Sequence, residues 1–285
     1  MIKKRAMGIT AVIYFSISSI LNAQRPLPLS AKPSNEKPQE ISKENQAADN
    51  KQSPSKGWIL SSVLARDIGI GGNGEVYVIG NNPIAGGYGI WRLIKGNEWQ
   101  EIGGGAVRID VDDKGIPWVV NSIGQIFKRE GNEWRLMPGL ASDIGIGADG
   151  SVWIIGTNIV HDGGFGIWKW TGKDWMTFDG AALKIDVDRN GDPWVISAYG
   201  DIFKRENSSW KMIGGKAKDI GIGADGSVFI IGTNPCGGGY GIWKWNGSSW
   251  NEIGGGAVCI SVDESGNPWV INSGDNIFRW GNKEK

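Results

Sequence analysis

Three stretches of the sequence place an asparagine, a glycine pair and an aromatic residue in the same order. In each of them the aromatic residue stands two positions before an Ile-Trp pair. A side-chain amide donates and accepts hydrogen bonds with hydroxyl groups, and an aromatic ring covers the apolar C–H face of a sugar. We therefore predict three pseudo-equivalent saccharide sites from these residues: Asn82 with Tyr88, Asn158 with Phe165, and Asn234 with Tyr240.

A structural interpretation of the same residues stays open. Asparagine can close a turn through its side chain, glycine permits that turn, and the aromatic ring can pack between neighbouring sheets. A further candidate is Tyr199, which departs from the sister loops Asn121-Ser122 and Asn272-Ser273. We predict that Tyr199 is exposed and contributes a ligand contact.

The sequence gives little support to chemistry beyond binding. His161 is its single histidine, and no Ser or Cys accompanies it as an activated nucleophile. The segment from Asp186 to Gly191 resembles the start of an EF-hand loop, but Ser197 stands where a bidentate Glu is required. We predict no catalytic residue, no metal site and no cofactor, and we expect that the protein is not an enzyme.

The charge balance limits the classes of partner, and the number of cysteines limits the possible disulfides. Thirty basic residues balance thirty acidic ones, so the positive footprint of a nucleic-acid-binding protein is missing, and no nucleic-acid partner is predicted. Two cysteines, Cys236 and Cys259, fall in successive repeats. Both a disulfide and two free thiols are compatible with this placement.

The N-terminus differs in composition from the rest of the chain. Residues 1–23 combine basic residues, an apolar run and a small residue before the predicted cut, which is typical of a secretory signal peptide. A retained anchor is the alternative. Residues 24–56 are rich in Pro, Ser, Lys and Asn and are predicted to be a disordered linker. The mature protein is thus expected to be secreted, to lack a membrane span, and to consist of a folded part at residues 57–285.

A repeated framework must position the candidate binding residues. The string DIGIG begins at Asp67, Asp143 and Asp219, and Pro-Trp pairs end at Trp118, Trp194 and Trp269. Each repeat divides into two halves that share one order of short apolar segments and glycine-rich turns. Four short strands per unit of about 40 residues is the sequence pattern of a β-propeller blade.

The count of these units predicts an all-β fold, a six-bladed β-propeller. The last unit lacks its fourth strand, and the segment Gly57–Leu60 before the first unit resembles that missing strand. An N-terminal strand is therefore predicted to complete the last blade and close the ring, which removes the open sheet edge. Tryptophans inside apolar strands are predicted to be buried, whereas those that begin an outermost strand are predicted to be partly exposed: Trp118, Trp194 and Trp269 in the first group, and Trp99, Trp175 and Trp250 in the second.

The repeat itself resembles a known one. The segment Trp99 to Ala106, then Ile109-Asp110-Val111, Pro117 to Asn121 and Gly124 to Phe127 resembles the tectonin repeat, and the pattern recurs over residues 57–285. The resemblance implies a lectin-like propeller, since the tectonin family includes lectins that bind lipopolysaccharide or glycans. The tectonin family also contains intracellular adaptors, so the resemblance implies binding rather than catalysis.

We therefore expect a non-catalytic, monomeric lectin that recognises surface glycans, polysaccharide or lipopolysaccharide through several weak sites on one face. Several sites on one rim would bind a dense glycan surface by avidity. The alternative is a propeller that acts as a protein-interaction scaffold without sugar binding. Retention on a polysaccharide matrix and release by free sugar would distinguish the two.

Overall fold

The computed structural model describes residues 56–161 and 163–283, and the regular structure in them is entirely β-strand. The predicted signal peptide and linker lie outside the described residues, apart from Lys56, which begins β1. No helix in the described part of the chain is long and apolar enough to cross a membrane.

The strands are short, and glycine-containing turns separate many of them. Their bounds are β1 (Lys56–Ile70), β2 (Val76–Ile84), β3 (Gly87–Lys95), β4 (Glu98–Ala106), β5 (Arg108–Val111), β6 (Pro117–Val120), β7 (Gln125–Glu130), β8 (Glu133–Ile146), β9 (Val152–His161), β10 (Gly164–Trp170) and β11 (Trp175–Ala182). The second half of the chain contains β12 (Lys184–Val187), β13 (Pro193–Ile196), β14 (Asp201–Glu206), β15 (Ser209–Lys216), β16 (Asp219–Ile222), β17 (Val228–Cys236), β18 (Gly239–Trp245), β19 (Trp250–Ala257), β20 (Cys259–Val262), β21 (Pro268–Ile271) and β22 (Asn276–Asn282).

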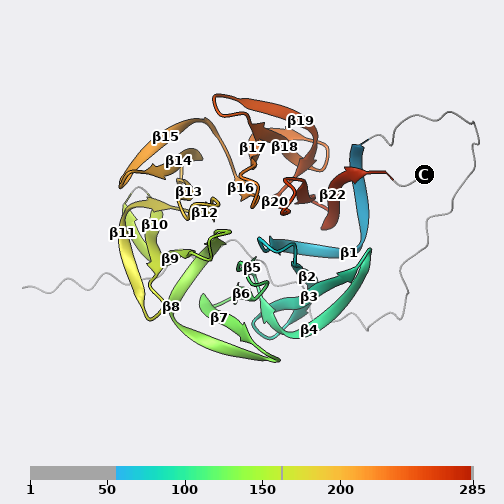
Figure 1. Ribbon diagram of the computed structural model, residues 1–285, viewed down its shortest axis with the longest axis horizontal. Helices are drawn as coiled ribbons and strands as arrows, with labels where there is room; N and C mark the ends of the chain where they lie inside the picture. The colour runs from blue at the N-terminus through green and yellow to red at the C-terminus, as the bar shows by residue number, and fades with distance from the viewer. Residues whose placement is uncertain (1–55, 162, 284–285) are drawn as a thin grey trace, which may run out of the picture. The chain divides into compact units, whose positions relative to one another are not determined.

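Neighbouring strands pair antiparallel in chain order, and they are arranged around a common centre (Figure 1). The sheets are β20-β21-β22-β1-β2-β3-β4, β11-β10-β9-β8-β7-β6-β5, β12-β13-β14-β15 and β16-β17-β18-β19. Two long strands, β1 and β8, each pair with a different strand along each half of their length. The first half of β1 pairs with β22, with Trp58 opposite Trp280, and its second half pairs with β2. The two ends of the described chain are therefore hydrogen-bonded to each other.

An aspartate stabilises the turn between β12 and β13, the first two strands of their sheet. Asp188 Oδ1 accepts hydrogen bonds from the backbone N–H groups of Asn190 and Asp192 at 2.9 and 3.2 Å. Gly191 takes a φ of 82° in this turn, a conformation that favours glycine. The segment that resembles an EF-hand loop is thus a β-hairpin whose carboxylate satisfies its own backbone.

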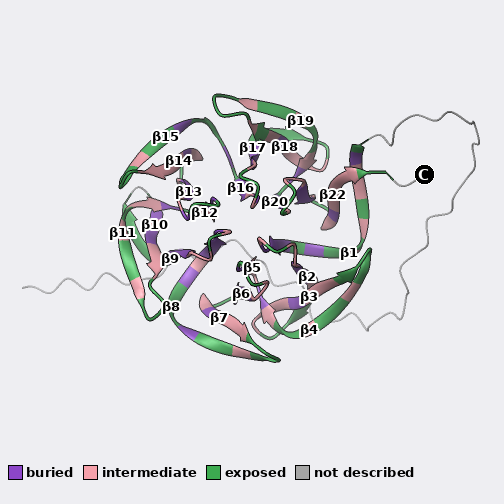
Figure 2. Cartoon of the chain, in the orientation of Figure 1, coloured by how far each residue is buried: buried purple, intermediate pink, exposed green. Residues whose placement is uncertain are grey.

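The buried side chains form six clusters among the described residues, each between facing groups of strands. Figure 2 shows that the buried positions gather on the strands nearest the centre, while the outermost strands are mostly exposed or half-buried. Trp118, Trp194 and Trp269 are 2%, 4% and 6% exposed, which confirms the prediction that they belong to the core.

Tryptophans on the outermost strands join neighbouring groups of strands. Trp250 Nε1 donates to Gly214 O at 2.6 Å, and Trp210 Nε1 donates to Asp179 O at 2.8 Å. The indoles of Trp58, Trp134 and Trp175 likewise donate to a backbone oxygen of the preceding outermost strand, and Trp99 Nε1 donates to the hydroxyl Oγ of Ser61 on β1. These side chains are half-buried, as predicted for Trp99, Trp175 and Trp250. We call the six bonds the indole latches.

Candidate functional site

A groove of about 510 Å³ surrounds Asn234 and opens between β15 and the strands β17 to β19. Asn234 is exposed, and Oδ1 of its amide accepts a hydrogen bond from Trp243 Nε1 at 3.1 Å. The second tryptophan of the groove, Trp250, has its N–H in an indole latch. The polar residues of the lining are Lys216, Thr233, Asn234 and Glu252. The groove therefore combines two indole rings with neutral hydrogen-bonding side chains, one positively charged side chain and one negatively charged side chain.

Two glycines make room for the Asn234 side chain. A Cβ atom at Gly241 would overlap Asn234 Nδ2, and one at Gly232 would lie 2.9 Å from Asn234 Oδ1. Real Cβ atoms do not approach other groups so closely, so the amide can lie against the sheet only because both positions lack a side chain. Glycine at positions 232 and 241 is thus required for the Asn234 amide to fit in this place.

The other two asparagines have similar surroundings. Asn82 Oδ1 accepts from Trp91 Nε1 at 3.4 Å, and a Cβ atom at Gly166 would lie 2.8 Å from Asn158 Nδ2. Both asparagines are exposed. The strand that faces each one differs, however. The position held by Gly215-Lys216 beside Asn234 is Gly139-Leu140 beside Asn158 and Val63-Leu64 beside Asn82, so the three surroundings are not equivalent.

The predicted aromatic partners lie on the opposite face of the same sheets. Tyr240 packs on the buried cluster that contains Ile231 and Ile242, whereas Trp243 packs on a different cluster, which contains Ile230. Tyr88 and Phe165 are likewise half-buried against clusters of their own. The structure does not bring the asparagine and the aromatic residue of a predicted pair into one cleft, because alternate residues of a strand face opposite sides. Their ligand binding stays a prediction.

Lysine and arginine cover two of these rings. Lys218 Nζ lies 4.4 Å from the centre of the Tyr240 ring, and Arg66 Cζ lies 4.3 Å from the centre of the Tyr88 ring. A sugar could not stack on a ring face that a cation already occupies. The tryptophans beside the asparagines, Trp91, Trp168 and Trp243, belong to the same sequence pattern, each as the Trp of its Ile-Trp pair.

A second kind of cleft lies between β10–β11 and β13–β15. It has a volume of about 230 Å³, and Tyr199, His161 and Trp210 contribute to its lining. Tyr199 is 67% exposed, as the sequence pattern predicted, and Ile159 near the end of β9 is 74% exposed. A cleft with the corresponding lining, about 330 Å³, lies beside Gly255, Gly256 and Trp58. Gly255 and Gly256 of β19 (Trp250–Ala257) thus border a cleft that Tyr240 does not line.

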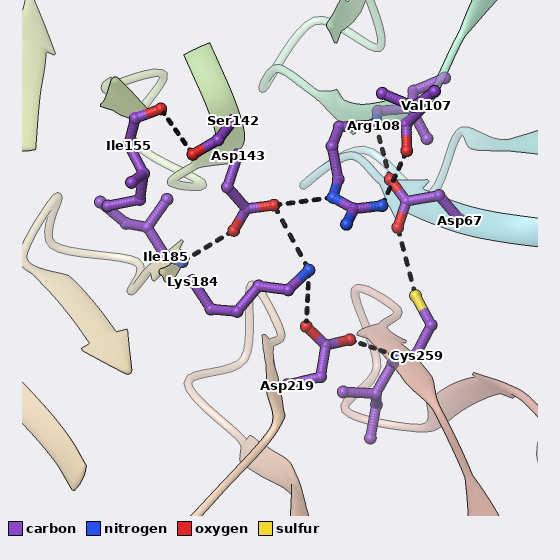
Figure 3. A network of polar contacts seen from close by, with 12 residues as sticks. Asp67, Val107, Arg108, Ser142, Asp143, Ile155, Lys184, Ile185, Asp219 and Cys259 are labelled. Carbon is purple, nitrogen blue, oxygen red and sulfur yellow. Dashed lines mark hydrogen bonds and ion pairs between the residues drawn. The ribbon is translucent and has the colours of Figure 1, made fainter. Parts of the chain in front are cut away.

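The centre of the strand arrangement contains a polar network that we did not predict from the sequence (Figure 3). Each inner strand contributes one residue to it, and the acidic Asp67, Asp143 and Asp219 alternate with Arg108, Lys184 and the uncharged Cys259. We call these six residues the central ring. Aligning the repeats at this one position would have revealed the alternation, since the three DIGIG strings share the aspartate.

Ion pairs and backbone hydrogen bonds hold the central ring. Lys184 Nζ lies 3.5 Å from Asp143 Oδ1 and 3.3 Å from Asp219 Oδ1, and Arg108 Nε lies 3.3 Å from Asp143 Oδ1. Each aspartate also accepts from the next inner strand, as Asp67 Oδ2 does from Ile109 N at 2.8 Å. Burial opposes the charged form of Lys184, but Asp143 and Asp219 outweigh burial and raise its pKa.

The carboxylates of this network are poorly solvated. Burial raises the pKa of Asp67 to about 6, although Arg108 and Lys184 act in the opposite direction. Two further aspartates, Asp110 and Asp186, line the same small polar cavity. Burial raises the pKa of both well above the ordinary value, and the charge of Asp110 adds to the effect on Asp186. Burial in this network therefore favours the neutral form of these carboxyl groups.

The structure decides between the two cysteine alternatives. Both thiols are free, with Cys236 exposed and Cys259 buried. Cys259 Sγ donates to Asp67 Oδ1 at 3.3 Å, and burial raises the pKa of this thiol. Across residues 56–161 and 163–283, no group of three or more His, Cys, Asp or Glu side chains is arranged to hold a metal ion.

Comparisons with known proteins agree with the repeat and the fold. A sequence model of the Tectonin domain matches residues 105–208 and again residues 182–285. No curated protein matches the chain. Among solved structures, "YCF48 bound to D1 peptide" shares 12% identity at a TM-score of 0.52, covering 82% of this chain and 97% of that one.

Two further solved structures match over a similar length. The WD40 β-propeller domain of Doa1 has a TM-score of 0.52 at 12% identity, covering 80% of this chain and 98% of that one. A chain of the Mitotic Checkpoint Complex has the same TM-score at 8% identity, with 85% and 98% covered. At such identities the likeness concerns the β-propeller fold alone.

Proposed function

Because this chain belongs to the Tectonin domain family, we propose that it is a non-catalytic lectin that binds surface glycans or lipopolysaccharide through weak sites on the propeller. The groove around Asn234 is the observation that carries the proposal. It presents an exposed amide between two half-buried indole rings, with Glu252 and Lys216 at hand. Indole faces suit the C–H surface of a sugar ring, and the amide and carboxylate suit its hydroxyls.

The proposed scaffold is a six-bladed propeller closed by β1. Two observations support it: the six buried clusters of the described residues, and the antiparallel pairing of β1 with β22. The scaffold repeats each groove position three times, which gives the multiple sites of the proposal. Since a sugar exchanges hydrogen bonds with water for hydrogen bonds with protein, each site is weak, and a dense glycan surface binds by avidity.

A glycan and lipopolysaccharide array tests the proposal. We expect the wild-type protein to bind a subset of glycans, and Asn234→Ala to weaken that binding roughly tenfold because the amide supplies one or two of the hydrogen bonds. Asn251→Ala is the matched control, since Asn251 is an exposed asparagine on β19 that does not line the groove. The triple variant with Ala at 82, 158 and 234 should lose binding. Unchanged binding by the triple variant would contradict the sites as assigned.

A protein-interaction scaffold is the second candidate, and the cleft at Tyr199 favours it. Tyr199 in its turn is 67% exposed, and Ile159 and Val160 near the end of β9 are 74% and 49% exposed, so an apolar surface is available to a peptide. A scaffold would fail to bind any glycan on the array and would not be released from a polysaccharide matrix by free sugar. A Tyr199→Ser variant that keeps full glycan binding would separate this surface from the sugar sites.

We also propose export from the cell, with residues 1–23 as the signal peptide. A glycan-binding protein meets its ligands outside the cytoplasm, and the charged and apolar order of the N-terminus is that of a secretory signal. N-terminal sequencing of the mature protein from its native source should begin at Gln24. A mature protein that still begins at Met1 would contradict this proposal.

A further inference from the structure

A groove of about 460 Å³ lies where β22, β1 and the turn between β3 and β4 meet. Its lining contains two cations, Arg279 and Lys283, and no acidic side chain. Trp58 and Trp269 supply aromatic surface, and Ser61 and Asn97 supply polar groups. The groove around Asn234 differs, because there Lys216 is accompanied by Glu252.

Arg279 lacks the ion pair with a hairpin aspartate that Lys128 and Lys204 form at the corresponding positions. Lys128 and Lys204, at the corresponding strand position, reach the aspartate of their own hairpin: Lys128 Nζ lies 3.5 Å from Asp112 Oδ2, and Lys204 Nζ lies 3.1 Å from Asp188 Oδ2. The corresponding aspartate for Arg279 is Asp263. Within residues 56–161 and 163–283, Arg279 forms no ion pair.

The reason lies in a substitution next to Asp263. Asn267 Nδ2 lies 3.2 Å from both carboxylate oxygens of Asp263, and the backbone N–H groups of Ser265 and Asn267 donate to Oδ1 as well. The corresponding residues beside Asp112 and Asp188 are Ile116 and Asp192, which contribute only their backbone N–H. The carboxylate of Asp263 is therefore already satisfied.

The unpaired guanidinium is held in place by an aromatic ring. Arg279 Cζ lies 5.8 Å from the centre of the Trp269 ring, and the side chain is half-buried. The Asn97 amide is oriented as well, since its Oδ1 accepts from Ser61 Oγ at 2.9 Å and from Ser62 N at 3.1 Å. Both bonds use the oxygen, so the Nδ2 donor of Asn97 is available to a ligand.

We infer that this groove binds the anionic group of an acidic saccharide: a carboxylate, sulfate or phosphate against Arg279 and Lys283, with the sugar ring against Trp58. This inference rests on the proposed lectin function and adds the charge of its ligand. A guanidinium offers paired N–H donors that match such anions, and a groove without acidic residues does not repel them. The binding weakens as salt rises, because the partly exposed charges are screened.

The test is an array of matched neutral, carboxylated, sulfated and phosphorylated saccharides. We expect Arg279→Gln to reduce binding of the acidic saccharides at least tenfold and to leave neutral ones unchanged, with Arg279→Lys retaining part of the binding. Lys244→Gln is the control, since Lys244 lies over the Phe229 ring and outside this groove. Thermal unfolding of each variant verifies the fold.

The outcomes separate the two proposals. Neutral saccharides bound by the wild type, with acidic ones bound no better and unaffected by Arg279→Gln, would overturn the anion site and leave the lectin function standing. Loss at Asn234→Ala confined to neutral saccharides, with acidic binding kept, would support two distinct sites. Binding of no saccharide of either class would overturn both proposals.

Discussion

At the scale of single residues, the central ring places polar side chains from one repeat position in a buried site. Each aspartate of the ring accepts a hydrogen bond from a backbone N–H of the next inner strand. The basic residues Arg108 and Lys184 lie between the aspartates. The sixth position holds Cys259, which offers Asp67 a thiol hydrogen bond but no positive charge. Asp67 is therefore the aspartate of the ring with the weakest compensation for its burial.

We predict that the protein is more stable at pH 5 than at pH 7.5. The pKa of Asp67 is about 6 in the folded state against an ordinary value of 3.8, so the folded state binds the proton more tightly than the unfolded chain does. The stabilisation by that proton is complete below the unfolded pKa and is lost as pH rises through about 6. From Asp67 alone the difference is roughly 1 kcal/mol, and Asp110 and Asp186 act in the same direction. Urea unfolding at both pH values measures it; equal stability, or a gain toward pH 7.5, would contradict the assignment.

A base at position 259 should remove part of this pH dependence. In Cys259→Lys the ammonium group would lie between Asp219 and Asp67, as Lys184 lies between Asp143 and Asp219. It would lower the pKa of Asp67 and recover about 1 kcal/mol at pH 7.5. Cys259→Met, of similar length and uncharged, is the control. Urea unfolding that gives the same pH slope for both variants would show that charge at this position is irrelevant.

The candidate site was only partly predictable at this scale. The sequence identified Asn234 and its glycines because they repeat, but repetition does not tell which face of a strand a neighbour occupies. Tyr240 and Trp243 are three residues apart, and the strand places them on opposite faces. The loss of the partner of Arg279 depends on a contact between Asn267 and Asp263, which no spacing rule contains.

At the scale of strands, the prediction was closer, because local chemistry determines short hairpins. The Asp or Asn and the Gly of each first turn specify its conformation, and the alternation of apolar residues specifies the buried face. The indole latches were not predicted, although their tryptophans were noted. Five latches join residues 31 to 38 positions apart, and the Trp58 latch joins residues 196 positions apart. Such pairing follows only once neighbouring groups of strands are docked.

Removing one latch should have a small, measurable cost. In Trp250→Phe the ring surface is largely kept, but Gly214 O loses the donor that lies 2.6 Å away. We expect a loss of about 1 kcal/mol in the free energy of unfolding, the usual net value of one hydrogen bond. Trp280→Phe is the control, since no hydrogen bond of the Trp280 indole to another described residue is found. A loss in the control as large as in Trp250→Phe would attribute the effect to ring size rather than to the latch.

At the scale of the whole propeller, the repeated scaffold carries grooves that differ. Pseudo-symmetry would make all three asparagine grooves alike, yet Lys216, Leu140 and Leu64 occupy one equivalent position. The junction between β22 and β1 differs further, since the last described strand there pairs with the first and brings Arg279 beside Ser61 and Asn97. A scaffold of this kind can keep its core uniform while each junction takes a different ligand.

The junction of the chain ends can be compared directly with an internal one. Trp58 and Trp210 occupy the same position, each with a latch to the preceding outermost strand, at 3.2 Å to Gly254 O and 2.8 Å to Asp179 O. Each indole also packs on a buried cluster. We expect Trp58→Ala and Trp210→Ala to cost a similar 3–4 kcal/mol, about the usual effect of removing a large packed aromatic side chain. If Trp58→Ala left urea unfolding unchanged while Trp210→Ala destabilised the protein, β1 would not be paired with β22 in solution, and the proposed closed ring would have to be abandoned.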